Sequence, residues 1–221
     1  MRRLFILLPA LWLPIRLSAQ TAATTPPARQ WGVSANLFPL IASGYHVSVE
    51  RRWHPASRSS VVLTPQWYRG PVNDFTSDLH DAGADRVQGF GAELQHRIYL
   101  GPESAPLDGF YVSYGASYQH FRMQFRAASW QPELGPDGLY YYEYRQRPQT
   151  ETIDRFGAVA VLGRQWVFPG SPFFLDAYLG MGLRTAGSRA TLPGNHFATS
   201  MSDYGHEGYY LPVGFRLGVM L

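Results

Sequence analysis

The sequence predicts an all-β fold, and more narrowly an eight-stranded antiparallel up-and-down transmembrane β-barrel. Its last stretch, residues 209–221, alternates apolar side chains with small or charged ones, which is the pattern of a β-strand with one apolar face. Similar stretches recur along the chain, and the connections between them alternate short and long, as in outer-membrane barrels. Beyond the N-terminal segment, no apolar run is long enough to cross a bilayer as a helix.

The composition suits a β-protein with many turns, because the 221 residues are 15% aromatic and include 22 Gly and 17 Pro. The absence of Cys excludes disulfides and thiol chemistry. The formal net charge of +3 comes from 19 basic residues, all of them Arg, against 16 acidic ones. Three of the Arg lie in the predicted signal peptide. The mature chain is therefore neutral, and we expect no binding to nucleic acid.

The N-terminus has the pattern of a secretory signal. Arg2 and Arg3 precede an apolar segment at residues 4–13, which is too short to span a bilayer. We expect a signal peptide over residues 1–19 and a polar, Pro-rich periplasmic leader over residues 20–29. The barrel then occupies residues 30–221.

Three strands are expected in the first part of the barrel. Residues 30–38 alternate Trp, Val, Ala and Leu with Gly, Ser and Asn. Residues 45–53 alternate Tyr and Val with His, Ser, Glu and Arg. Residues 60–69 continue the pattern, and Pro65 within them predicts a bulge.

Two longer strands follow. Residues 86–100 alternate Phe, Ala, Leu and Ile with Gly, Glu, Gln and Arg. Residues 109–127 begin in the same way, but Phe121, Met123 and Phe125 fall on the other phase. This change predicts a bulge, or a strand that has left the bilayer.

The last three strands are expected at residues 153–168, 173–185 and 209–221. Before them, residues 128–152 contain a turn signal, Gly-Pro-Asp-Gly, and predict a hairpin that projects above the membrane. Short connections fall at residues 39–44, 54–59, 101–108 and 169–172, and long ones at 70–85, 128–152 and 186–207. Aromatic residues gather beside the short connections, as in the girdle at a membrane interface.

Four stretches carry a resemblance to known proteins: SANLFPL, FGAELQHRIYLG, VLGRQWVFP and FFLDAYLGMGLR. The chain resembles the small eight-stranded outer-membrane barrels of the OmpA/OmpX type. It is closer to a family of uncharacterised outer-membrane barrels of Gram-negative bacteria. The similarity covers most of the mature chain as a pattern, and Leu221 replaces the terminal Phe common in such barrels. The resemblance implies the fold and the outer membrane, but no established activity.

Charged residues share the face that we expect to point inward. An eight-stranded barrel is just wide enough for its own side chains, so these charges predict an ion-pair network that fills the lumen. A narrow ion pathway is the alternative. The inward glycines are expected to make room for the Arg side chains. The predicted network consists of Glu50, Arg52, Glu93, Arg97, Asp176, Arg184 and Arg216.

The projecting hairpin carries a cluster suited to surface binding, because Tyr and Arg are favoured at binding surfaces. It could contact a partner or lipopolysaccharide head groups, or be only an extended hairpin edge. The cluster consists of Tyr140, Tyr141, Tyr142, Tyr144, Arg145 and Arg147. We expect a monomer in contact with outer-membrane lipid and lipopolysaccharide, inserted by the barrel assembly machinery through its C-terminal strand.

The sequence predicts no cofactor, no metal site and no catalytic residues. The seven His lack metal-ligand spacing, and no G-x-S-x-G motif is present. One alternative is a barrel enzyme that modifies lipid A, for which His120, Ser113 and Ser117 are the candidates. Another is a soluble, lipocalin-like periplasmic carrier, which would have its apolar face inside.

Overall fold

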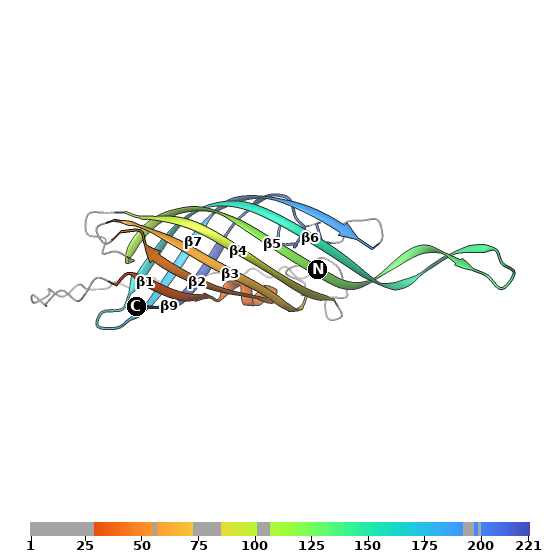
Figure 1. Cartoon of the computed structure of the whole chain (residues 1–221), viewed down its shortest axis with the longest axis horizontal. Helices are drawn as coiled ribbons and strands as arrows, with labels where there is room; N and C mark the ends of the chain where they lie inside the picture. The colour runs from red at the N-terminus through yellow and green to blue at the C-terminus, as the bar shows by residue number, and fades with distance from the viewer. Residues whose placement is uncertain (1–28, 55–56, 73–84, 101–106, 192–196, 199) are drawn as a thin grey trace, which may run out of the picture.

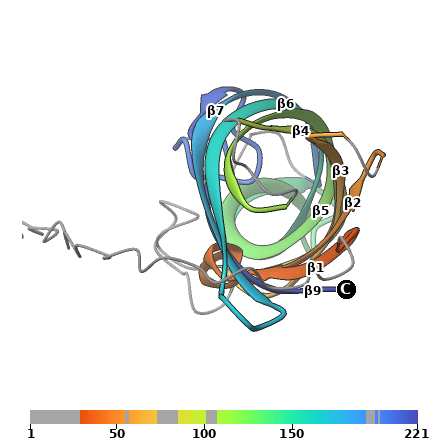
Figure 2. The ribbon, with the colours of Figure 1, turned by 90° about the vertical axis from the view of Figure 1, so that its left-hand side faces the viewer.

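The computed structural model describes residues 29–54, 57–72, 85–100, 107–191, 197–198 and 200–221. The predicted signal peptide, residues 1–19, and nearly all of the predicted leader, residues 20–29, lie outside these ranges. The described residues form one antiparallel sheet that curls into a barrel, seen from the side in Figure 1 and from one end in Figure 2.

Nine strands and one short 3-10 helix make up the described chain. In order they are β1 (Trp31–Asn36), η1 (Phe38–Ala42), β2 (Gly44–Arg52), β3 (Ser59–Pro71), β4 (Arg86–Tyr99), β5 (Gly109–Leu134), β6 (Tyr140–Val167), β7 (Phe173–Ala190), β8 (Gly208–Tyr210) and β9 (Val213–Met220). No helix among the described residues is long and apolar enough to cross a membrane.

The strand pairings form a closed ring. Each strand from β1 to β6 pairs with the next, β6 pairs with β7, β7 pairs with β9, and β9 pairs with β1. All of these pairings are antiparallel, so the predicted all-β fold with an antiparallel ring of strands is confirmed. Eight of the nine described strands make up the ring, because β8 is a short addition that pairs with β7 alone.

The last predicted strand, residues 209–221, is divided in the structure. Leu211 and Pro212 separate β8 from β9, and Pro has no N–H for a strand ladder. The ladder between β1 and β9 ends at Asn36 and Arg216, where the chain leaves β1 and enters η1. We call this place, between η1 and residues 211–213, the seam of the barrel.

Strands β5 and β6 are longer than predicted, with 26 and 28 residues. They pair along their whole length, from Gly109 opposite Gln165 to Leu134 opposite Tyr140. The hairpin predicted for residues 128–152 is therefore confirmed, and it projects far beyond the barrel (Figure 1). Its turn needs Gly138, whose φ of 78° lies in the left-handed region that glycine tolerates.

Strand β5 keeps a single phase, so of the two alternatives predicted near Phe121 the bulge is wrong. Gln119, Phe121, Met123 and Phe125 all lie buried on the inner face, and the register with β4 is unbroken. The sequence appeared to change phase because the inner face itself changes from polar to apolar at this level.

The bulge predicted at Pro65 is also wrong. The register between β2 and β3 is the same on both sides of it, from His46 opposite Gln66 to Val49 opposite Leu63. The ladder lacks only the pair at the proline itself and one adjacent pair, as expected for a residue that cannot donate a backbone hydrogen bond.

The inside of the barrel is filled in layers. Near the hairpin end, an apolar plug closes it, made of Tyr68, Val72, Val87, Phe121, Met123, Phe125, Ile153, Phe197 and Tyr204. A second apolar cluster lies nearer the C-terminal end, made of Tyr99, Leu107, Tyr111, Val159, Val161, Phe174 and Met220. Polar side chains line the space between them.

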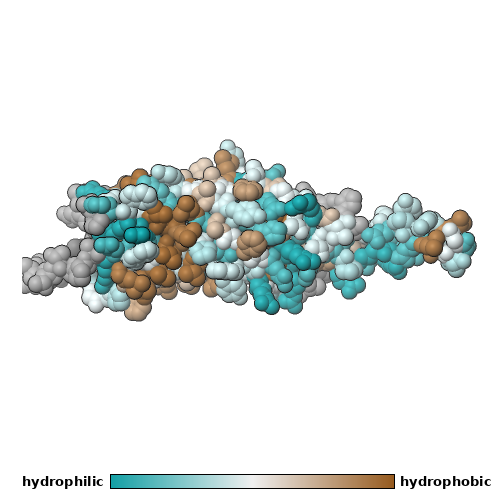
Figure 3. Space-filling view, in the orientation of Figure 1, coloured by the Kyte–Doolittle hydropathy of each residue, from teal (hydrophilic) through white to brown (hydrophobic). Residues whose placement is uncertain are grey.

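The outer face of the barrel is apolar over much of its height. Figure 3 shows this surface as a band of hydrophobic side chains, with hydrophilic ones toward the projecting hairpin. Exposed members of the outer face include Val47, Leu63, Leu94, Leu162, Leu179, Leu183, Phe215 and Leu217.

Candidate functional site

All seven charged residues predicted to face inward lie on the inner face of the barrel, because they occupy the buried phase of their strands. Four of them come together in one group, which we call the charged layer: Glu50, Arg97, Asp176 and Arg216. Their side chains are between 1% and 5% exposed. The other three, Arg52, Glu93 and Arg184, lie elsewhere on the same face.

The charged layer is held by direct ion pairs. Arg97 Nη1 donates to Glu50 Oε2 at 3.0 Å, and Arg97 Nη2 donates to Asp176 Oδ2 at 2.9 Å. Arg216 Nη1 donates to the same Asp176 oxygen at 3.1 Å. Two cations thus meet two anions, which is the balance that burial demands.

Neutral side chains complete the coordination of these charges. Tyr99 donates to Glu50 Oε1 at 2.8 Å and Tyr111 donates to Asp176 Oδ1 at 2.7 Å. The guanidinium of Arg97 also lies 4.3 Å from the ring centroid of Tyr111, and that of Arg216 lies 4.3 Å from the ring of Tyr178. These tyrosines were not predicted from the sequence. The signal was present, because each lies two residues from an inward-facing residue of its own strand.

Glycines on the inner face make room for these rings. A Cβ added to Gly163 would collide with the Tyr111 ring, and one added to Gly214 would collide with Tyr178. From the sequence, the inward glycines are expected to make room for Arg side chains. In the structure the aromatic rings occupy that space, and the Arg side chains stack on the rings.

The remaining predicted charges have separate environments. Glu93 accepts a hydrogen bond from Gln95 Nε2 at 2.7 Å, and Arg52 Nη2 donates to the backbone oxygen of Ser57 at 3.3 Å. Arg184 Nε donates to the backbone oxygen of His206 at 2.9 Å, and its Nη2 donates to that of Met201 at 2.6 Å. Arg184 therefore ties the segment before β8 to the barrel wall.

Arg155 is a further interior cation that the sequence analysis did not identify. Its Nε donates to Gln119 Oε1 at 2.7 Å and its Nη1 to the backbone oxygen of Tyr204 at 3.0 Å. Its guanidinium lies 4.9 Å from the ring centroid of Phe121. The signal was present, since Arg155 stands two residues after Ile153 on the inner face of β6.

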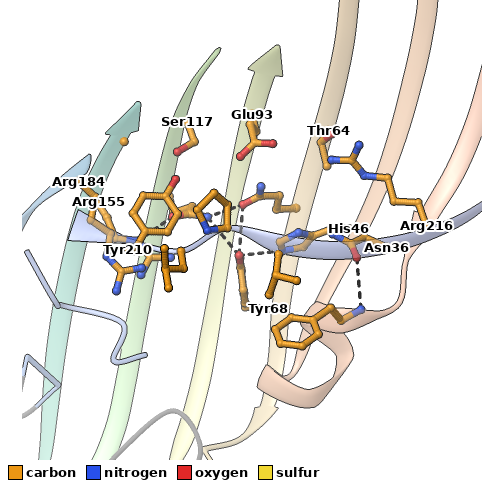
Figure 4. A pocket seen from close by; sticks show the side chains of 17 residues that line it. Asn36, His46, Thr64, Tyr68, Glu93, Ser117, Arg155, Arg184, Tyr210 and Arg216 are labelled. Atoms are coloured by element: carbon orange, nitrogen blue, oxygen red, sulfur yellow. Dashed lines mark hydrogen bonds between the residues drawn. The ribbon is translucent and has the colours of Figure 1, made fainter. Parts of the chain in front are cut away.

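A cavity of about 230 Å³, the lumen cavity, lies between the charged layer and the apolar plug. Arg216 lines it from the first and Tyr68 from the second. Figure 4 shows Arg155 and Arg184 beside Tyr210 at one end of this cavity, and Arg216 beside Asn36 and His46 at the other. Phe38, Leu211, Pro212 and Val213 also line it, so the cavity reaches the seam.

His120 lies on the outer face of β5, away from Ser113 and Ser117. Its Nδ1 is 2.7 Å from Asp154 Oδ1, which also accepts a hydrogen bond from Tyr118 at 2.9 Å. The two serines lie on the inner face, and Ser113 donates to Gln95 Oε1 at 3.0 Å. Among the described residues, no group of three His, Asp or Glu side chains is placed to hold a metal ion.

The projecting hairpin leaves its aromatic cluster exposed on both faces. Tyr140, Tyr142 and Tyr144 stand on one phase of β6, and Tyr141 and Arg145 on the other. Arg145 and Arg147 both bond Glu133 across the hairpin, and the bond from Arg147 is the main reason that the pKa of Glu133 is lowered.

The turn of the hairpin has its own polar contact. Tyr141 donates to Asp137 Oδ2 at 2.5 Å, and this hydrogen bond lowers the pKa of Asp137. The carboxylate also accepts a hydrogen bond from the backbone N–H of Leu139 at 3.1 Å. The turn therefore keeps a fixed, negatively charged end beside the exposed tyrosines.

The chain matches no protein-family model, and no curated protein matches it in sequence. Among solved structures, the barrel is similar to the crystal structure of Acinetobacter baumannii CarO. That comparison has a TM-score of 0.40 and 10% identity and covers 88% of this chain and 98% of the other. For Acinetobacter baumannii CarO2 the TM-score is 0.38 at 10% identity, over 87% of this chain and 98% of that one. Values this low carry no inference about function.

Proposed function

We propose that the chain is a monomeric outer-membrane β-barrel with a blocked lumen and a structural or surface-binding role. The observation that carries the proposal is the inverted polarity of the barrel. Arg97, Asp176 and Arg216 are each 1% exposed inside it, whereas Leu and Val side chains cover the outside. A soluble lipocalin-like carrier would have the opposite arrangement. Lipid would cover an apolar outer face of this kind.

The ends of the apolar band also suit a membrane. Aromatic side chains are exposed near the short connections, as expected at a membrane interface: Trp31, Trp53, Phe110, Phe168 and Phe173. Toward the hairpin end, Arg69, Gln88, Arg122, Thr152 and Arg189 lie opposite one another on successive strands from β3 to β7. All three of these Arg side chains are exposed, which supports contact with the phosphate groups of lipopolysaccharide.

A blocked lumen is supported at two levels. The charged layer crosses the barrel from β2 and β4 to β7 and β9, and the apolar plug closes it on the hairpin side. An ion would have to break buried ion pairs and then pass a cluster of aromatic rings. We therefore favour a filled lumen over an ion pathway.

The projecting hairpin is the element best placed for binding at the surface. Tyr140 is 71% exposed and Tyr142 is 69% exposed. Exposed Tyr and Arg side chains on a protruding strand pair are of the kind found in binding interfaces. Insertion by the barrel assembly machinery would use β9, whose outer face presents Val213, Phe215 and Leu217.

Cell fractionation tests the location. We expect the mature chain in the outer-membrane fraction, with an electrophoretic mobility that changes on heating, as a stable barrel unfolds. Recovery in the soluble periplasmic fraction would overturn the membrane proposal.

Planar-bilayer recording tests the blocked lumen. We expect no discrete conductance steps from the purified barrel. Discrete conductance steps that the folded wild-type barrel shows, and that disappear when it is unfolded by heat, would favour the ion pathway instead.

A shortened hairpin tests the surface-binding role. Ala128 lies opposite Gln146, so replacing residues 129–145 with Asn-Gly places a two-residue turn on an existing pair. We expect the shortened barrel to remain folded and to bind purified lipopolysaccharide more weakly, with the exposed Arg69, Arg122 and Arg189 still in place. The matched control replaces Leu139 with Ala in the turn and keeps all the Tyr and Arg side chains. Equal binding by the shortened barrel would remove the hairpin from the proposal.

We infer binding rather than catalysis, because His120 and the two candidate serines point to opposite faces of β5. The mass of lipid A is expected to be unchanged when the chain is expressed. A new lipid A species that disappears in His120→Ala would establish the enzyme instead.

A further inference from the structure

Two hollows of the barrel meet at the seam. The first is the lumen cavity. The second, which we call the outer groove, is an apolar depression on the outside, formed by β5, β6, β7 and β9. Phe38 and Val213 line both. The outer groove is lined mainly by Leu100, Phe110, Leu162, Ala177, Leu179 and Phe215.

The break in the strand ladder explains why the wall is open here. β9 begins at Val213 and β1 ends at Asn36, while β8 pairs only with β7. At this level η1 and the Leu211–Pro212 link stand where a continuous strand pair would otherwise close the wall. The side chains at this opening are apolar, with Phe38 39% exposed and Leu211 63% exposed.

The lumen cavity, which lies on the inner side of the opening at the seam, is positively charged. Within the described chain, Arg155 and Arg184 have no carboxylate within ion-pairing distance, and their hydrogen-bond acceptors are amide and backbone oxygens. Arg155 is 9% exposed, so its charge is buried beside the cavity. The one carboxylate in the lining, Glu93, faces Arg216 rather than these two cations in Figure 4. A buried cation, Arg155, and a half-buried one, Arg184, that both lack an acidic partner favour an anion at this place.

The sizes of the two hollows set the shape of the ligand. At about 230 Å³ the lumen cavity is smaller than the usual range for drug-sized ligands, so it suits a small head group. The outer groove offers no charged partner except Arg164 and suits a hydrocarbon chain.

We propose that the seam binds a single-chain amphiphile with a small anionic head group, a carboxylate or a phosphate monoester. The head group lies in the lumen cavity against Arg155 and Arg184. The hydrocarbon chain passes between Phe38 and Val213 and lies in the outer groove. This site goes beyond a structural or surface-binding role, since it uses the inside of the barrel and neither the hairpin nor the Arg side chains outside.

Equilibrium binding of radiolabelled laurate tests the proposal, with the full barrel in nanodiscs of zwitterionic phospholipid and empty nanodiscs as background. We expect saturable binding of one laurate per barrel. Dodecyl phosphate should compete, whereas dodecanol and dodecyltrimethylammonium should not, because they lack the negative charge. If inorganic phosphate competed with laurate and dodecyl phosphate did so no better, the cavity would be a site for a free anion, and the amphiphile proposal would be overturned.

Two kinds of variant locate the site. Ser117→Leu places a larger side chain in the lumen cavity while leaving both Arg in position, and its matched control is Ala116→Leu, one residue away on the outer face. Arg155→Gln and Arg184→Gln remove the charges, with the exterior Arg122→Gln as their control. We expect at least about tenfold weaker laurate binding for each interior variant and unchanged binding for both controls.

The cavity-filling variant keeps the test decisive if an Arg variant fails to fold. Folding is checked by the heat-dependent shift in electrophoretic mobility. Normal laurate binding by a folded Ser117→Leu barrel, or equal binding of dodecanol and laurate by the wild type, would overturn the proposal.

Discussion

The charged layer and the projecting hairpin contain the same kind of ion pair in two different surroundings. In the charged layer, the side chains of Arg97 and Asp176 are each 1% exposed. In the hairpin, the paired side chains of Arg145 and Glu133 are 54% and 33% exposed. Arg97 bonds two carboxylates inside the barrel, and Arg145 likewise approaches two, on Glu133 and Glu143.

This difference shows that the surroundings of an ion pair, rather than the pairing itself, determine how much the pair contributes to stability. Water solvates both partners in the hairpin whether or not they meet, so the pair adds little. Inside the barrel, a carboxylate that loses its cation remains buried without a counter-charge, which is costly. The charged layer should therefore control whether the barrel folds, whereas the hairpin pairs should affect only the hairpin.

The largest effect is expected for Arg97→Met, which leaves Glu50 unpaired and Asp176 with Arg216 alone. Breaking a buried ion pair from one side costs about 3–5 kcal/mol, so the free energy of unfolding should fall by about that amount. Urea titration of the barrel refolded in phospholipid vesicles measures it. Arg145→Met in the hairpin is the matched control and should leave the urea midpoint unchanged. Similar losses for the two variants would contradict the comparison.

A smaller effect is expected for Tyr111→Phe, which keeps the ring under Arg97 and removes only the donor to Asp176 Oδ1. Leaving a buried acceptor without its hydrogen bond costs about 1–3 kcal/mol. Tyr45→Phe, on the outer face of β2, is the control, because Tyr45 is 52% exposed. The same urea titration should separate the two variants. No loss for Tyr111→Phe would mean that Arg97 and Arg216 alone satisfy Asp176.

The period-two pattern was enough to predict the ring of strands and the inward face of the charged residues. It could not say which of them meet, because Arg97 and Asp176 are 79 residues apart in the chain and the register of several strands brings them together. For the same reason Arg52 and Arg184, which have the same pattern as Arg97, have different partners in the structure.

Two errors have a shared physical cause. An inner face that changes from polar to apolar along one strand looks like a change of phase, which is why the sequence around Phe121 predicts a bulge or a strand that has left the bilayer. Arg155 was missed on β6, where the apolar Ile153 is its neighbour on the same face. Assigning the faces of a strand from alternating polarity assumes that the whole interior of the barrel is polar. The apolar plug does not meet that assumption. The seam was also missed, because Pro212 fits the alternation of residues 209–221 and only the pairing shows the break.

The smallest effect is expected at Glu133, and it is confined to the hairpin. Arg147 and Arg145 lower the pKa of Glu133 from its ordinary value of 4.5, so the ionised carboxylate favours the paired hairpin. This contribution is fully present above the ordinary pKa and is lost as the pH falls through the lowered one. Amide hydrogen exchange at residues 140–147 should therefore quicken at acid pH in the wild type, relative to the intrinsic exchange rate at each pH. In Glu133→Gln, amide exchange at these residues should already be fast at neutral pH. The control is Glu143→Gln, because the Glu143 carboxylate lies 3.4 Å from Arg145 Nη1 and makes the weaker contact. The urea midpoint of the barrel should stay the same in both variants, and a shift of that midpoint with Glu133→Gln would show that the hairpin and the barrel unfold as one unit.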